Sequence, residues 1–189
     1  MGVEVKVAYG DRLSMFKTIK SIKDIISQEK GNYIYVNVAS GSKIQAIACM
    51  MACMVLKECD NLQPFYAEPE SYAAFEGKQQ SFGIKDTIPL PTYEIQIPKP
   101  KLLAALKIIA QQPNQKITKK EMAQIAEEQK IITVNAEDEN HSQARFASLD
   151  KNIIVPLEKQ WKFIEVEKIG RNRWIKITQE GIDASEFLI

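Results

Sequence analysis

A short polar turn in the first half of the chain could bind an anion. It consists of Ser40, Gly41, Ser42 and Lys43, and it joins a strand-like segment to a long apolar helical segment. Free backbone N–H groups and the positive end of the helix dipole favour phosphate at such a turn, and two hydroxyls and an ammonium group add to this. The spacing is not that of a Walker A loop. Two interpretations stay open: a ligand-binding site, or a turn that only caps the helix.

A second group of polar residues, in the second half, could contact nucleic acid. Apolar residues recur at three- and four-residue steps in residues 142–160, which predicts a helix whose opposite face is small and polar. Two strand-like segments follow, 163–167 and 173–177, and the turn between them predicts a β-hairpin with cations at its tip. Such side chains bind base edges and phosphates. The candidate DNA-binding residues are Arg145, Ser148, Lys151, Asn152, Arg171, Asn172 and Arg173.

The three cysteines and the single histidine do not form the set of residues that metal binding or catalysis needs. Cys49, Cys53 and Cys59 lie in or beside one apolar helical segment, and the single histidine, His141, is far from them. Zinc takes four ligands, and a catalytic triad needs a histidine beside its nucleophile. We therefore expect buried free thiols, no metal site, no cofactor and no catalytic residue.

The first half has the segment order of an α/β domain. Strand-like residues 3–9, 33–39 and 62–67 alternate with helical residues 14–29 and 42–57, which predicts a doubly wound unit with a parallel sheet. The second of these helices is apolar almost all round. It should therefore be covered on more than one side, by its own sheet and by a further partner such as a second subunit.

Four prolines between residues 83 and 100 predict a connector between two domains. We place the first domain at residues 1–97 and the second at residues 98–189.

The second half has the segment order of a winged helix-turn-helix domain. Residues 101–111 form a first helix, Thr118 caps a second with Glu121 completing a capping box, and residues 142–160 form the third. Pro156 should kink the third helix or shift its late turns. The hairpin and a last helix, from 178 to 187, complete the order. Winged helices bind DNA or other proteins, and both interpretations stay open.

Charge and length exclude several classes of protein. The chain has 189 residues, with 25 basic and 24 acidic side chains and 45% apolar residues, which is typical of a folded protein and not of a disordered one. The acidic residues Glu137, Asp138 and Glu139 precede the third helix and oppose DNA binding. The longest apolar run, 44–56, is too short to span a bilayer, and no secretory signal is visible. A cytoplasmic protein without a membrane partner is expected.

Together, residues 37–48, residues 65–72, the proline-rich connector and the Pro156-Leu157-Glu158 segment resemble one group of archaeal transcriptional regulators. These regulators join a CARF-like (CRISPR-associated Rossmann fold) domain to a C-terminal winged helix-turn-helix domain. The Ser-Gly-Ser-Lys turn matches their strand-end motif of Thr or Ser, Gly, a small residue and Lys. Their additional N-terminal β-α-β stretch is not found here, so the Rossmann-like, CARF-like domain is expected to be incomplete at its N-terminus.

The resemblance implies a homodimer that binds double-stranded DNA and senses a nucleotide. Residues 40–43 would contact a cyclic oligoadenylate or a related anionic nucleotide across the dimer axis. The expected function is thus a ligand-responsive, DNA-binding transcriptional regulator and not an enzyme. The alternative is a ring nuclease, in which Ser42 and Lys43 stabilise the transferring phosphate while the 2′-hydroxyl of the ligand attacks it.

Overall fold

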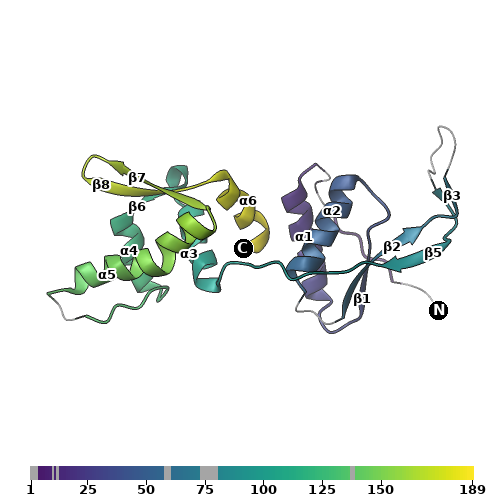
Figure 1. Ribbon diagram of the computed structural model, residues 1–189, viewed down its shortest axis with the longest axis horizontal. Coiled ribbons are helices and arrows are strands. Elements are labelled where there is room, and N and C mark those ends of the chain that lie inside the picture. Colours follow the sequence, from purple (N-terminus) through teal and green to yellow (C-terminus); the bar gives the residue numbers. More distant parts are fainter. Residues whose placement is uncertain (1–3, 10, 12, 58–60, 73–80, 137–138) are drawn as a thin grey trace. The chain divides into compact units, whose positions relative to one another are not determined.

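The computed structural model describes residues 4–9, 11, 13–57, 61–72, 81–136 and 139–189. The chain folds as two compact units, Met1–Gln96 and Ile97–Ile189 (Figure 1). Each unit has its own sheet and its own buried residues.

The first unit contains a mixed three-stranded sheet in the order β1-β2-β5. Strand β1 (Ile34–Asn37) runs parallel to β2 (Leu62–Glu68), and β2 pairs antiparallel with β5 (Asp86–Pro89). A short antiparallel pair, β3 (Ser71–Tyr72) and β4 (Ser81–Phe82), lies beyond β2 and β5. Only one strand pair is parallel, so the expected Rossmann-like parallel sheet is not confirmed.

The strand expected at residues 3–9 is wrong for the part of it that the structure describes. Residues 4–9 form no strand, and Val5 and Val7 are 79% and 70% exposed. Val3 lies outside the described residues. Alternating β-branched residues favour a strand only when a neighbouring strand completes the hydrogen-bonded ladder and covers one face, and here neither occurs.

Two helices lie on the same side of the sheet of the first unit (Figure 1). Helix α1 (Met15–Gln28) is capped by Ser14, as expected. Helix α2 (Lys43–Val55) packs against both α1 and β2. A doubly wound sheet has helices on both faces. The described residues show one layer of helices on one layer of strands.

The second unit follows the order expected from the sequence. Its helices are α3 (Pro100–Ala110), α4 (Lys119–Glu128), α5 (His141–Leu149) and α6 (Gln179–Leu188). Two π-helical segments, η2 (Asp150–Ile154) and η3 (Pro156–Gln160), extend α5, and a single 3₁₀ turn, η1 (Pro113–Gln115), follows α3. The hairpin consists of β7 (Ile164–Ile169) and β8 (Asn172–Ile177).

A short strand that was not expected, β6 (Lys116–Thr118), pairs with β8 and completes a sheet of order β6-β8-β7. Three residues carry too little periodicity to be recognised as a strand. Because β6 comes directly before α4, this pairing fixes the start of α4 to the base of the hairpin. One continuous apolar core then joins the helices to the sheet, with Leu106, Met122, Leu149, Leu157 and Ile175 fully buried in it.

Candidate nucleic-acid interface

The third helix of the second unit, residues 141–160, continues through Pro156 without a break. The N–H of Val155 donates to the carbonyl of Asp150, and the N–H of Trp161 donates to that of Pro156, so both bonds span five residues. In an α-helix the proline ring would clash with the carbonyl of Asn152. The wider π turns make room for it. The expected shift of the late turns is therefore confirmed.

Two rows of side chains run along opposite sides of this helix at steps of four residues. One row is fully buried and consists of Leu149, Ile153 and Leu157. The other is exposed and consists of Gln143, Ala147, Lys151, Val155 and Lys159. We call the second set the exposed row.

The π segment keeps the exposed row on one face. In an α-helix a step of four residues overshoots a full turn by about 40°, so a row at this spacing winds around the helix. A π-helix has more than four residues per turn, so a step of four residues is less than one full turn there. The row is therefore displaced around the helix in the opposite direction, which compensates for the displacement in the α-helical part. The exposed row can therefore lie along a groove over its whole length.

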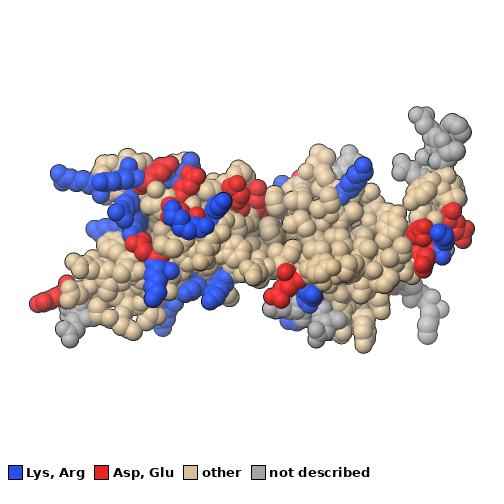
Figure 2. Space-filling model, in the orientation of Figure 1, with Lys and Arg blue, Asp and Glu red and all other residues tan. Residues whose placement is uncertain are grey.

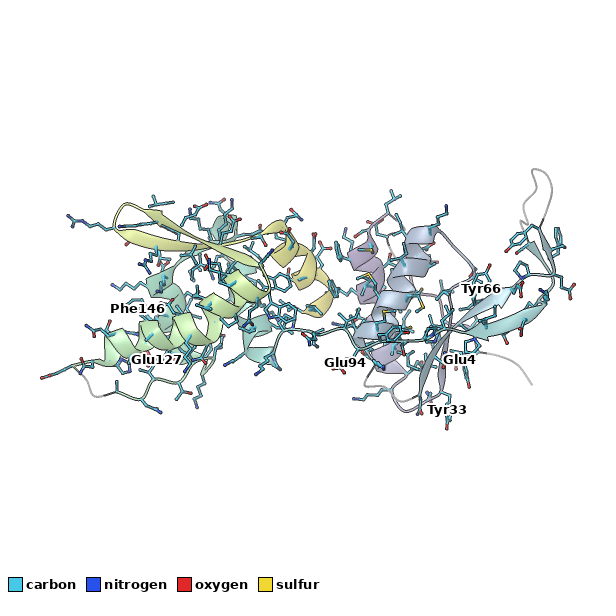
Figure 3. The ribbon with its side chains drawn as sticks, in the orientation of Figure 1. Glu4, Tyr33, Tyr66, Glu94, Glu127 and Phe146 are labelled. Atoms are coloured by element: carbon cyan, nitrogen blue, oxygen red, sulfur yellow. The ribbon has the colours of Figure 1, made fainter. Side chains whose placement is uncertain are left out.

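Three candidate DNA contacts on this helix have partners inside the unit. Arg145 Nη1 lies 3.3 Å from Glu127 Oε2, and Ser148 Oγ donates to the carbonyl of Thr133 at 2.9 Å. Glu127, which lies on α4, is labelled in Figure 3. Asn152 Nδ2 donates to the carbonyl of Ser148 at 2.9 Å. Any contact of these side chains with DNA would compete with these bonds, and their role in DNA binding stays a prediction.

Glu127 joins the two helices of the helix-turn-helix. Besides Arg145 it contacts His141 Nε2, at 2.9 Å from its Oε1. A second link is made by Lys119 at the start of α4, whose Nζ lies 2.6 Å from Asp150 Oδ2 and 5.7 Å from the ring centre of Phe146. These contacts set the position of the third helix relative to α4.

Lys151 and the hairpin tip present unpaired cations to solvent. Lys151, Arg171, Asn172 and Arg173 are exposed, and none of the three cations has an ion pair within the described ranges. Lys168 was not among the candidate residues from the sequence. It is exposed and lies opposite Arg173 in the register of the two hairpin strands. Figure 2 shows Lys and Arg side chains gathered over this end of the unit.

The hairpin is built to project these cations. Gly170 and Arg171 form the two-residue turn between the paired residues Ile169 and Asn172. Gly170 has φ +61°, as the first residue of a type II′ turn requires. On the neighbouring strand β6, Lys116 Nζ lies 3.5 Å from Glu167 Oε2 and 5.1 Å from the ring centre of Trp174. The tip is therefore carried on a supported hairpin.

The Ser-Gly-Ser-Lys turn of the first unit is exposed and is capped by its own helix. Ser42 Oγ accepts from the N–H of Gln45 at 3.3 Å, and Gln45 Oε1 accepts from the N–H of Ser42 at 2.8 Å. Gly41 has φ +90°, and a Cβ on it would lie 2.8 Å from Gln45 Oε1. A ligand that uses the Ser42 N–H must displace the Gln45 amide, while Ser40 and Lys43 remain exposed beside it.

Helix α2 leaves part of its apolar surface exposed within the first unit. Ala48, Ala52 and Cys53 are fully buried, whereas Ile44 and Ile47 are 40% and 53% exposed. No other described residue of the first unit covers these two side chains fully, and a second covering element for the helix stays a prediction.

The thiols of α2 lie in an apolar environment. Burial raises the pKa of Cys49 and, more strongly, raises that of Cys53 to about 12. Cys59 lies outside the described residues, as do Glu137 and Asp138. Among the residues whose placement is described, no group of three or more His, Cys, Asp or Glu side chains could hold a metal ion.

No helix in the described part of the chain is both long and apolar enough to cross a lipid bilayer.

Comparison with known families identifies the second unit. Residues 101–189 match the family described as "DUF6293 C-terminal winged helix domain", and residues 1–72 match the one described as "HFX_2341_N:-like, N-terminal". The chain is also 27% identical over 160 residues to an uncharacterized protein, MJ1513, of Methanocaldococcus jannaschii. That match covers 72% of this chain and 48% of the relative, so the chain spans about half of the relative's length. The chain thus carries a C-terminal winged helix domain that follows a mixed α/β unit in the sequence.

Proposed function

We propose that this protein is a DNA-binding transcriptional regulator whose winged helix domain binds duplex DNA. The observation that carries the proposal is the arrangement of four exposed cations that have no ion pair with another described residue: Lys151 on the exposed row, and Lys168, Arg171 and Arg173 at the hairpin tip. The helix would enter the major groove while the tip grips the adjacent backbone or minor groove.

The local charge pattern supports DNA despite a net charge of only +1 for the chain. Two acidic residues at the third helix are engaged within the unit: Glu127 binds His141 and Arg145, and Asp150 binds Lys119. Glu139, just before the helix, is exposed and opposes binding. Phosphate contact depends on the charges at the interface and not on the total.

Fluorescence anisotropy with a labelled random-sequence duplex tests the proposal. Replacing both Arg171 and Arg173 by Ala should weaken binding and reduce the slope of log K against log salt by about 2, since each lost phosphate contact removes about one unit. The control is Lys107→Ala, which removes one exposed charge from α3. No binding by the folded wild type, or equal slopes in the double variant and the wild type, would favour a protein-binding winged helix.

The proposal includes a homodimer formed through α2. Its exposed Ile44 and Ile47 supply the apolar surface that a second copy would cover. Light scattering after size exclusion should give a dimeric mass for the full chain and a monomeric mass for Ile47→Glu, because the introduced carboxylate would be buried unpaired. A monomeric wild type, or a dimeric variant, contradicts this part.

The proposal also includes a nucleotide sensor at residues 40–43. Support comes from the exposed Lys43 ammonium and the positive φ of Gly41 at the start of α2. Titration calorimetry with cyclic oligoadenylate should give binding that Lys43→Ala weakens and Lys57→Ala does not. Analysis of the same mixtures for linear product distinguishes this sensor from the alternative, a ring nuclease. Absence of both binding and product leaves the turn as a helix cap.

A further inference from the structure

The first half of the exposed row has the chemistry to read bases as well as to bind phosphate. Gln143 and Ala147 lie one α-helical step of four residues apart on α5, and both are exposed. In helix-turn-helix proteins the N-terminal part of the recognition helix reaches the base edges, and the third helix of this unit corresponds to the recognition helix. These two residues hold that position here.

Gln143 is the amide side chain on this face that is free to bind a base. Its side chain has no hydrogen bond to another described residue, whereas Asn152 is held by Ser148 and by Lys101 Nζ at 3.3 Å. A free glutamine amide can accept from N6 and donate to N7 of adenine at the same time, a pattern that no other base presents in the major groove.

Ala147 complements this chemistry. Its methyl group lets the helix approach the groove closely, and it can contact the C5 methyl of thymine. Lys151, one further step along the row, carries a charge that a phosphate or a guanine satisfies equally well. The discriminating chemistry therefore belongs to the first two members of the row.

We propose that Gln143 and Ala147 give this protein a preference for an A·T base pair in its DNA site, with Gln143 bound to the adenine. This inference rests on the proposed function, because it requires that the third helix enters a major groove.

Selection from a pool of random duplexes, followed by sequencing, tests it with the full-length chain. The wild type should enrich a site with a fixed adenine. Gln143→Ala should bind duplex DNA with the same salt dependence but lose between about 5-fold and 150-fold of its preference at that base pair. Gln143→Arg should change the preferred base from adenine to guanine, because arginine pairs with O6 and N7 of guanine.

Gln160→Ala is the matched control, since it removes an exposed glutamine from the far end of the same helix and should leave the site unchanged. All variants are exposed substitutions, so circular dichroism and melting temperature should match the wild type. Binding without base preference, or a site unchanged in Gln143→Ala and Gln143→Arg, overturns the inference while the proposed function stands. A folded wild type that binds no duplex DNA overturns both.

Discussion

Arg145 and Lys151 lie six residues apart on one helix, but their surroundings indicate different roles: a structural contact for Arg145 and ligand binding for Lys151. Arg145 is largely buried, with 26% of its side chain exposed, and it faces a carboxylate, Glu127, that is 28% exposed. Its Nε is buried without a hydrogen-bond partner in the described residues. Lys151 is exposed and unpaired within those same residues. The first side chain holds α4 against α5, and the second is available to a ligand.

This difference predicts separable effects of two charge deletions. Arg145→Ala should lower the free energy of unfolding by about 1–2 kcal/mol, between the values for surface and buried pairs, because Glu127 loses a partner in a partly desolvated site. Lys151→Ala should leave stability unchanged and weaken DNA binding. Urea denaturation and anisotropy on the same samples provide both readouts. A stable Arg145→Ala variant with strongly reduced affinity would instead place Arg145 on the DNA.

Cys53 should be protected from alkylation in the folded protein. Its pKa is raised to about 12 by burial, so at pH 8 only roughly one molecule in ten thousand carries the reactive thiolate. In a Cys59→Ser background, iodoacetamide should modify Cys53 slowly at pH 8, faster with each pH unit, and at once in urea. Rapid modification of the native protein at pH 8 would contradict the burial of this thiol.

The same shift has a consequence for stability. Above the ordinary thiol pKa of 9.0 the unfolded chain releases this proton, while the folded chain keeps it up to a pH of about 12. Ionisation of the thiol therefore stabilises the unfolded state but not the folded state. The contribution of Cys53 to stability falls as the pH rises through this window.

Residue types in the sequence predicted chemistry, but not which side chains would be free to perform it. Arg145, Ser148 and Asn152 were predicted to face DNA because they lie away from the apolar stripe. Their partners Glu127, Thr133 and Lys101 come from three other segments, and no local pattern shows that these approach the helix. Gln143 was missed although its spacing from Lys151, two steps of four, was visible in the sequence.

At the scale of elements, local signals predicted the caps and failed where pairing is non-local. The capping residues Ser14 and Thr118 were predicted from sequence and are confirmed. Residues 4–9 alternate as a strand should and form none, since alternation alone cannot supply a neighbouring strand. The π segment was not predicted as such, yet buried residues at strict four-residue steps from Leu149 to Leu157 fit wider turns better than an α-helix.

The capping box of α4 predicts a pH-dependent helix start. Thr118 Oγ1 and N–H donate to Glu121 Oε2 at 2.6 and 3.1 Å, and these bonds lower the pKa of Glu121 below its ordinary 4.5. The contribution of this carboxylate to stability is present above pH 4.5 and lost as the pH falls through the lowered pKa. Thr118→Ala should reduce the free energy of unfolding at pH 7 by about 1 kcal/mol.

Glu121→Gln separates the charge from the cap. Glutamine completes a capping box as well, so the variant should keep most of the stability at pH 7 and lose the dependence on pH below 4.5 that Glu121 contributes. Chemical denaturation of wild type and variant across about pH 3–7 measures this. Parallel curves for the two proteins would show that the Thr118–Glu121 bonds carry no such contribution.

At the scale of the whole chain, the second unit should fold without the first. Its core residues run from Leu102 to Ile177 and all come from the unit itself. Residues 97–189 expressed alone should therefore unfold in a single cooperative transition. Aggregation or a gradual transition would mean that the first unit contributes to this core.

The isolated unit should also reveal what the first unit adds to DNA binding. If α2 joins two chains, the full protein places two winged helices on one site, and binding of the second becomes intramolecular. The full chain should then bind a symmetric two-half-site duplex about 10²–10⁴-fold more tightly than residues 97–189, while both bind a single half-site alike. The Ile47→Glu variant, with its exposed apolar surface on α2 interrupted, should bind like the isolated unit. Equal affinity of the full chain and residues 97–189 for the two-half-site duplex would show that each winged helix acts alone, and the first unit would then have another role.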